Sequence, residues 1–118
     1  MTTIPRWVVS LVDENFSALN ADAPRDLEAT FTWDAVLTDM QTGVQVSGAA
    51  EISEYMTSFE DLTVERTSAV VYRDDYATFT FRYGNEATSM SAVITFKIED
   101  GQIAHQWIMA DQPGGYGA

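Results

Sequence analysis

Apolar side chains recur every three or four residues along the N-terminal part of the chain. This spacing predicts an amphipathic helix over residues 4–19, with Thr3 as its cap and Pro5 in its first turn. The residues on its apolar stripe are Trp7, Val8, Leu11, Val12, Asn15, Phe16 and Leu19. A second, shorter helix is predicted for residues 22–30, with Pro24 in its first turn.

The period of the pattern changes at Trp33. Residues 33–40 are rich in strand-forming side chains, and residues 41–43 are typical of a hairpin turn, with Gly43 where a positive φ is needed. Residues 44–46 are predicted to form the returning strand. A third helix is predicted to begin at Ser47 and Gly48, and its apolar face carries Ile52, Tyr55, Met56 and Phe59.

Four long strand-like runs occupy the second half of the chain, at residues 62–72, 76–83, 88–98 and 102–110. Helices followed by an antiparallel meander are typical of the α+β class. We therefore expect a curved antiparallel sheet wrapped around the N-terminal helices, forming a cone-shaped α+β barrel with an apolar pocket. Residues 1–111 are expected to form a single domain, and the glycine-rich residues 112–118 a flexible tail.

Composition and charge narrow the classes of function. With 118 residues, 46% of them hydrophobic, the chain can form one packed core. It has no cysteine, which excludes disulfides and thiolate chemistry. The net charge of -12 argues against binding to nucleic acid or to an anionic membrane. The N-terminus lacks a signal-peptide pattern, so we expect a cytoplasmic protein, and no residues at metal-ligand spacing appear, so we expect no metal and no other cofactor.

Four segments carry a resemblance to a known family. They are residues 17–21 (SALNA), 33–39 (WDAVLTD), 46–52 (VSGAAEI) and 100–111 (DGQIAHQWIMAD). With these segments and its order of elements, the chain resembles the nuclear transport factor two-like superfamily, in particular its branch of SnoaL-type polyketide cyclases and ketosteroid isomerases. The resemblance implies the fold described above. It leaves the activity open, because this fold hosts isomerases, dehydratases, epoxide hydrolases, cyclases and non-catalytic partners.

The resemblance also implies positions for catalytic residues. Asp39 falls where ketosteroid isomerases keep the aspartate that moves a proton. Asn15 stands in place of their oxyanion-hole tyrosine, and Ile94 in place of their second acid. Asn15 can still donate a hydrogen bond to a carbonyl oxygen, whereas Ile94 cannot. Ordinary steroid isomerisation is therefore not expected.

Three further positions distinguish the chain from its relatives. Ile108 occupies the place of an aspartate that SnoaL-type cyclases and limonene epoxide hydrolases have after the tryptophan of the last strand. The arginine and the second aspartate of those hydrolases correspond to positions near Phe81 and Tyr83. The resemblance thus implies a pocket that is more apolar than usual.

The polar candidates each have an alternative interpretation. Asp39 alternates with Leu37 and Ala35, so we expect it to face the pocket and act as a general base. The alternative is an aspartate that only binds backbone amides at the hairpin turn. Asn15 and Gln106 are candidates for neutral groups that bind a substrate carbonyl or hydroxyl, or else belong to an internal hydrogen-bond network.

The remaining candidates are apolar or aromatic. Substrate-binding residues are expected to be Tyr55, Tyr83, Gln106, Ile108, Ile94, Phe81, Met56 and Trp33. His105, the only histidine, alternates with Trp107 and Met109 and is placed on the outer face of the sheet. Relatives commonly dimerise through this face, so the resemblance implies a homodimer.

Three functional hypotheses follow. The first is a small-molecule enzyme of specialised metabolism, a cyclase or isomerase acting on a hydrophobic polyketide- or terpenoid-like substrate. This hypothesis includes a cyclase that accelerates a pericyclic cycloaddition by holding its substrate in a folded conformation. The second is a non-catalytic ligand carrier or assembly partner with the same fold. The third is a ketosteroid-type isomerase or dehydratase that uses Asp39 as its base.

Overall fold

The computed structural model describes residues 4–59, 62–84 and 89–110. Within these residues there are three helices, α1 (Arg6–Asn20), α2 (Pro24–Glu28) and α3 (Ala49–Thr57). The strands are β1 (Phe31–Asp39), β2 (Gln45–Ser47), β3 (Thr63–Arg66), β4 (Val71–Arg73), β5 (Tyr76–Gly84), β6 (Ser89–Glu99) and β7 (Gln102–Ala110). The predicted cap Thr3 and the predicted tail 112–118 lie outside the described residues.

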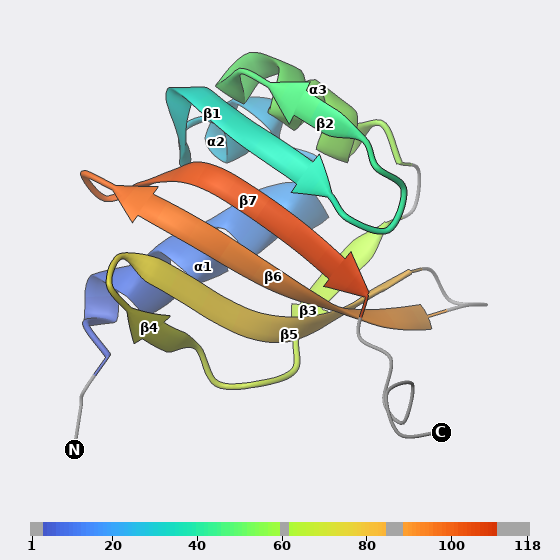
Figure 1. Cartoon of the computed structure of the whole chain (residues 1–118). Coiled ribbons are helices and arrows are strands. Elements are labelled where there is room, and N and C mark those ends of the chain that lie inside the picture. The colour runs from blue at the N-terminus through green and yellow to red at the C-terminus, as the bar shows by residue number, and fades with distance from the viewer. Residues whose placement is uncertain (1–3, 60–61, 85–88, 111–118) are drawn as a thin grey trace.

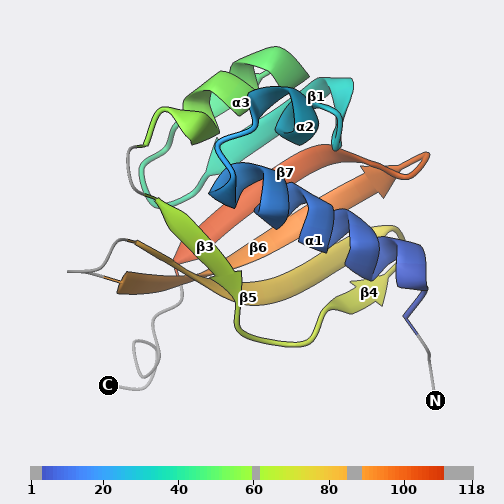
Figure 2. The same cartoon turned by 180° about the vertical axis from the view of Figure 1, so that it is seen from behind.

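All seven strands form one sheet in the order β2-β1-β7-β6-β5-β3, with β4 paired to β5. The sheet is curved and unclosed, and the helices lie on its concave face (Figure 1). Seen from behind, α1 runs across the part of the sheet that β5, β6 and β7 form (Figure 2). The pairs are antiparallel except β1 with β7, which is parallel. The α+β fold expected from the sequence is confirmed, with this one parallel pair as a difference.

The core lies between α1 and the concave face of the sheet. The ring of Phe16 packs edge-on against Phe79 and Phe81, with centroids 5.6 and 5.8 Å apart. Burying a side chain of this size contributes about 1.5–3 kcal/mol. Trp7, which the helical stripe placed inside, is 46% exposed, and its ring meets the edge of Tyr72 instead.

The predicted strand 62–72 is divided in two. β3 and β4 both pair with β5, at Arg66↔Phe81 and Val71↔Thr78. The segment from Arg66 to Val71 is therefore two residues longer than the part of β5 that it faces. The extra residues form a loop in which Ser68 Oγ accepts a hydrogen bond from the backbone N–H of Thr80, at 2.8 Å. A side chain thereby replaces a ladder partner, which is the behaviour of a bulge.

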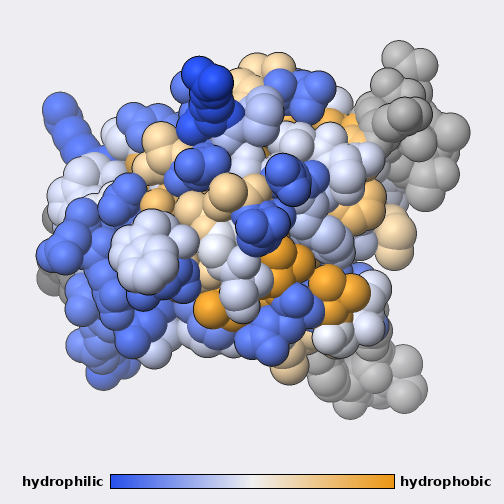
Figure 3. Space-filling view, turned by 90° about the horizontal axis from the view of Figure 1, so that it is seen from above, coloured by the Kyte–Doolittle hydropathy of each residue, from blue (hydrophilic) through white to orange (hydrophobic). Residues whose placement is uncertain are grey.

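The face of the molecule over β2 and α3 is mainly hydrophilic (Figure 3). Seen from above, its hydrophobic residues form only a limited patch among polar ones. Among the described residues, no helix is both long and apolar enough to cross a membrane.

Candidate functional site

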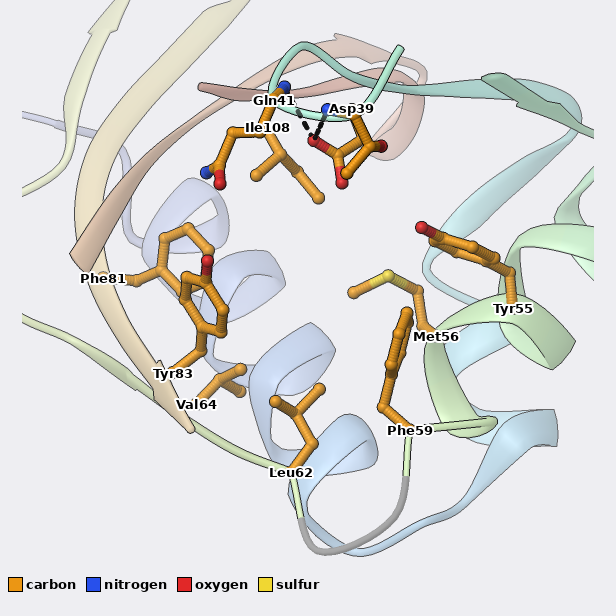
Figure 4. Close-up of a pocket in the computed structure, with 11 residues that line it drawn as sticks. Asp39, Gln41, Tyr55, Met56, Phe59, Leu62, Val64, Phe81, Tyr83 and Ile108 are labelled. Carbon is orange, nitrogen blue, oxygen red and sulfur yellow. Dashed lines mark hydrogen bonds between the residues drawn. The ribbon is translucent and has the colours of Figure 1, made fainter. Parts of the chain in front are cut away.

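A pocket of about 230 Å³ lies at the end of the sheet where β1 and β7 finish, between α3 and the strands β3 and β5 (Figure 4). Its size favours a small ligand, because pockets for drug-sized ligands begin near roughly 300 Å³. The lining residues are Asp39, Gln41, Thr42, Tyr55, Met56, Phe59, Leu62, Val64, Phe81, Tyr83 and Ile108.

Asp39 ends β1 beside Ile108 of β7. One carboxylate oxygen, Oδ1, accepts hydrogen bonds from the backbone N–H groups of Gln41 (2.9 Å) and Thr42 (3.4 Å). The same turn is closed by the N–H of Gly43, which donates to the backbone carbonyl of Asp39 at 2.8 Å with a φ of 80° at the glycine. The second oxygen points into the pocket (Figure 4). Asp39 thus has both features considered from the sequence: it holds the turn and faces the pocket.

Tyr55 faces Asp39 across the pocket. It comes from α3, and its hydroxyl is directed toward the carboxylate (Figure 4). Burial raises the pKa of the Tyr55 hydroxyl above its ordinary value of 10.0, and the negative charge of Asp39 raises that pKa further. The hydroxyl therefore stays protonated at neutral pH and is available as a hydrogen-bond donor. Beside it, Phe59 packs edge-on against the Tyr55 ring, with centroids 5.2 Å apart.

The opposite wall is also aromatic. Phe81 and Tyr83 alternate along β5 and have stacked rings, with centroids 5.4 Å apart. The hydroxyl of Tyr83 donates to the sulfur of Met90 at 3.8 Å, which directs it toward the neighbouring strand. Aliphatic side chains and Met56 complete the lining, so polar atoms are concentrated at the β1–β2 turn.

The pocket contains no cationic side chain. All six Lys and Arg residues of the chain lie in the described part, and none of them lines the pocket. Four of them form ion pairs elsewhere: Arg66 with Asp13, Arg73 with Asp74, Arg82 with Glu65, and Lys97 with Glu99. Among the described residues that line the pocket, the carboxylate of Asp39 therefore carries the only formal charge.

The structure brings six of the predicted site residues together here: Asp39, Tyr55, Met56, Phe81, Tyr83 and Ile108. Asn15 is buried away from the pocket, and its side-chain Nδ2 donates to Thr30 Oγ1 at 3.0 Å. This contact agrees with the alternative considered for Asn15, an internal hydrogen-bond network. A contact of Asn15 with a ligand in the pocket is not supported.

Three further expectations are corrected. Trp33 is 84% exposed and does not line the pocket. Gln106 and Ile94 do face inward, but each is 2% exposed and lies in the core rather than at the pocket wall. Gln106 pairs with Leu37 and Phe96 on the neighbouring strands, both of which are fully buried.

Sequence reasoning missed five lining residues, namely Gln41, Thr42, Phe59, Leu62 and Val64. Gln41, Thr42 and Leu62 lie in segments between elements, where no periodicity exists to orient a side chain, and Val64 lies in the short strand β3. Phe59 had a signal, because it shares the helical stripe of Ile52, Tyr55 and Met56.

His105 lies on the other face of the sheet. Its Nε2 is 3.0 Å from Thr38 Oγ1, and its ring stacks on Trp107 with centroids 3.8 Å apart. Burial lowers the pKa of the His105 ring below its ordinary value of 6.5, and the positive charge of Lys97 lowers that pKa further. Among the described residues, no three His, Asp or Glu side chains gather as metal ligands would.

Comparison with solved structures shows how common this architecture is. A putative ketosteroid isomerase from Kribbella flavida superposes with a TM-score of 0.78 at 16% identity, covering 95% of this chain and 87% of that one. A putative polyketide cyclase from Sinorhizobium meliloti gives 0.76 at 22% identity, covering 90% and 95%. A protein of unknown function with a cystatin-like fold from Methylobium petroleophilum gives 0.81 at 15% identity, covering 99% and 84%. At these identities the likeness concerns the fold alone.

No curated protein matches the sequence. The model of one protein family does, over residues 12–106, which include most of α1 and continue into β7. This match spans the pocket from Asp39 to Tyr83. The chain therefore belongs to the SnoaL-like domain family, within the superfamily that the sequence resembles.

Proposed function

We propose that the protein is an enzyme that moves a proton on a hydrophobic small molecule and thereby isomerises it or closes a ring. One observation carries the proposal: a carboxylate with one free oxygen and a protonated tyrosine hydroxyl face each other in an otherwise apolar pocket. A general base opposite a hydrogen-bond donor is the arrangement that proton abstraction next to a carbonyl requires.

In the proposed reaction, Asp39 removes a proton from the carbon beside a substrate carbonyl. The electrons of the C–H bond pass to the carbonyl oxygen, and Tyr55 donates a hydrogen bond to the negative charge that develops there. The backbone amides of Gln41 and Thr42 hold the other carboxylate oxygen, so the base keeps its orientation. Return of the proton to another carbon gives isomerisation. Attack of the enolate on a second carbonyl, which then takes the proton, gives ring closure.

The names given to two structures of similar fold support both outcomes. The structures from Kribbella flavida and Sinorhizobium meliloti are described as a putative ketosteroid isomerase and a putative polyketide cyclase. The aromatic walls suit a substrate with a planar or polyketide-like body, and a terpenoid-like body fits the aliphatic side chains equally well. Because the pocket is small, we expect a substrate, or a reacting end of one, of few rings.

Variants at the two facing groups test the proposal. Conversion of a simple β,γ-enone and of a linear diketone is followed by the absorbance of the conjugated product. Asp39→Asn is expected to lower kcat by about 100-fold or more, and Tyr55→Phe by about 10- to 100-fold. Asp34→Asn is the matched control, because it removes an exposed carboxylate from the same strand without touching the pocket.

Retained turnover in both pocket variants would contradict proton transfer and would favour ring closure through substrate folding alone. Binding without conversion would favour the second candidate, a ligand carrier. The observation that favours this candidate is that Asp39 is the only charged side chain among the described lining residues. Thermal unfolding of each variant separates a lost activity from a lost fold.

A further inference from the structure

The charge of the pocket indicates the chemistry of its ligand. We propose that the bound molecule carries a cationic amine at its polar end, which Asp39 and the surrounding aromatic rings hold. This inference rests on the proposed function only in taking this pocket as the ligand site, and it adds a substrate class that the fold does not specify.

The first argument is that Asp39 lacks a counter-ion. Its Oδ1 accepts two backbone N–H groups, whereas the other oxygen faces the pocket and has no hydrogen-bond donor among the described residues. None of the six Lys and Arg side chains reaches it. A carboxylate that is partly removed from water is stabilised by a paired cation, and an ammonium N–H on the ligand supplies both the charge and the hydrogen bond.

The second argument comes from the walls. Four aromatic rings line the pocket in two pairs, Tyr55 with Phe59 and Phe81 with Tyr83, on opposite sides. Aromatic rings attract a cation through the negative potential over their faces, and they do so best where water is displaced. The neutral, polarisable sulfur of Met56 lies between the two pairs and adds no competing charge.

The third argument concerns the whole molecule. A net charge of -12 gives the molecule as a whole a negative potential, which attracts cationic ligands and repels anionic ones. An anionic ligand, such as a free carboxylate or a phosphate ester, would meet the Asp39 charge with no cationic side chain to offset it.

A matched set of ligands tests the inference by binding alone. 1-Adamantylammonium, 1-adamantanol and 1-adamantanecarboxylate share one apolar body and differ in the charge of the polar end. Calorimetric titration at low salt is expected to give a dissociation constant about tenfold lower for the ammonium than for the alcohol, and the weakest binding for the carboxylate. Asp39→Asn is expected to abolish the preference of the ammonium over the alcohol, and the exposed control Asp34→Asn to leave it unchanged.

Phe59→Leu keeps the pocket apolar while removing one ring, so it is expected to weaken the ammonium more than the alcohol. Equal affinity for the two, or no binding of the ammonium, would overturn the inference. Such a result leaves the turnover of carbonyl compounds to be judged on its own. Conversely, a preserved ammonium preference without turnover would remove the proposed reaction and keep the ligand class.

Discussion

At the scale of single residues, His105 gives the chain a defined response to pH. Its pKa in the folded protein is lowered by burial and by Lys97, so the unfolded chain binds a proton there more readily than the folded one. The free energy of unfolding is therefore expected to fall as the pH drops from about 7 through the ordinary histidine pKa near 6.5, and to level off below the folded pKa.

A comparison of the wild type with His105→Gln isolates this contribution, because the chain has no other histidine. Urea unfolding at intervals between pH 8 and pH 5 is expected to show a smaller loss of stability in the variant over the range in which histidine titrates. The titration of carboxylates changes the free energy of unfolding equally in both proteins. Parallel curves for the two proteins over that range would show that the folded ring titrates as it does in the unfolded chain.

Single residues also show which side-chain positions a sequence pattern can predict. Alternation with Leu37 and Ala35 put Asp39 on the inner face, and the structure has it at the pocket wall. The same counting extended back to Trp33 was wrong, because the pairing of β1 with β7 shifts register between Phe31 and Val36. Phe31, on the far side of this irregularity, is buried again, so the irregular segment turns only Trp33 and its neighbours outward, and no residue type in the sequence marks it.

Asn15 shows a second limit of the same kind. The helical stripe correctly placed it inside, where it is 3% exposed. Its partner, Thr30, comes from the segment that follows α2, and its hydroxyl also donates to the carbonyl of Leu27 at 2.7 Å. Whether a buried amide meets a ligand or a neighbouring hydroxyl depends on how α2 packs beside α1, which periodicity does not describe.

At the scale of elements, one side chain joins the end of α1 to the edge strand β3. Asn20 Nδ2 donates to the carbonyl of Val64 at 2.9 Å, and the N–H of Val64 donates to Asn20 Oδ1 at 2.7 Å. The amide therefore pairs with the strand as a neighbouring backbone would. Asn20→Ala is expected to lower the free energy of unfolding by about 1–3 kcal/mol, because two hydrogen bonds are lost at a partly buried site.

Asn20→Asp sharpens this test, since it keeps the shape and the acceptor but replaces the donor that faces the carbonyl of Val64. It is expected to be at least as destabilising as Asn20→Ala at neutral pH. Glu14→Ala, an exposed change on the same helix, is the control and should stay within about 0.5 kcal/mol of the wild type in urea unfolding. A wild-type stability in both Asn20 variants would mean that solvent replaces the pairing at no cost.

The elements themselves could be predicted where a pattern was long. The amphipathic stripe gave α1, and strict alternation gave β5 and β6. The prediction of one continuous strand over residues 62–72 was wrong. Ser68 supplies a side-chain acceptor to β5, so the strand divides there although the segment contains no glycine or proline. The parallel pairing of β1 with β7 depends on contacts between the two ends of the chain, which local patterns do not encode.

At the scale of the whole molecule, the convex face of the sheet differs from the rest of the surface. Its half-buried side chains form rows across β1, β7, β6 and β5, and they are Val36, Thr38, Thr78, Thr80, Val93, Thr95, Lys97, His105, Trp107 and Met109. None of these is acidic, although the chain has 18 acidic residues. Rows of threonine and apolar side chains with no acidic member are suited to contact with a second copy of the chain, and Glu65 and Glu99 near them are paired with Arg82 and Lys97.

We therefore predict a homodimer formed through this face, with Trp107 near its centre. Light scattering is expected to give twice the 13.1 kDa mass of one chain, and added salt is expected to strengthen the dimer because it screens the repulsion between two chains of charge -12. Trp107→Glu should yield a folded monomer, since it buries a charge at the contact. Ser10→Glu adds the same charge to the exposed side of α1, away from this face, and should remain dimeric. A wild type that stays monomeric at every concentration, or a dimer that survives Trp107→Glu, would show that this face has another use.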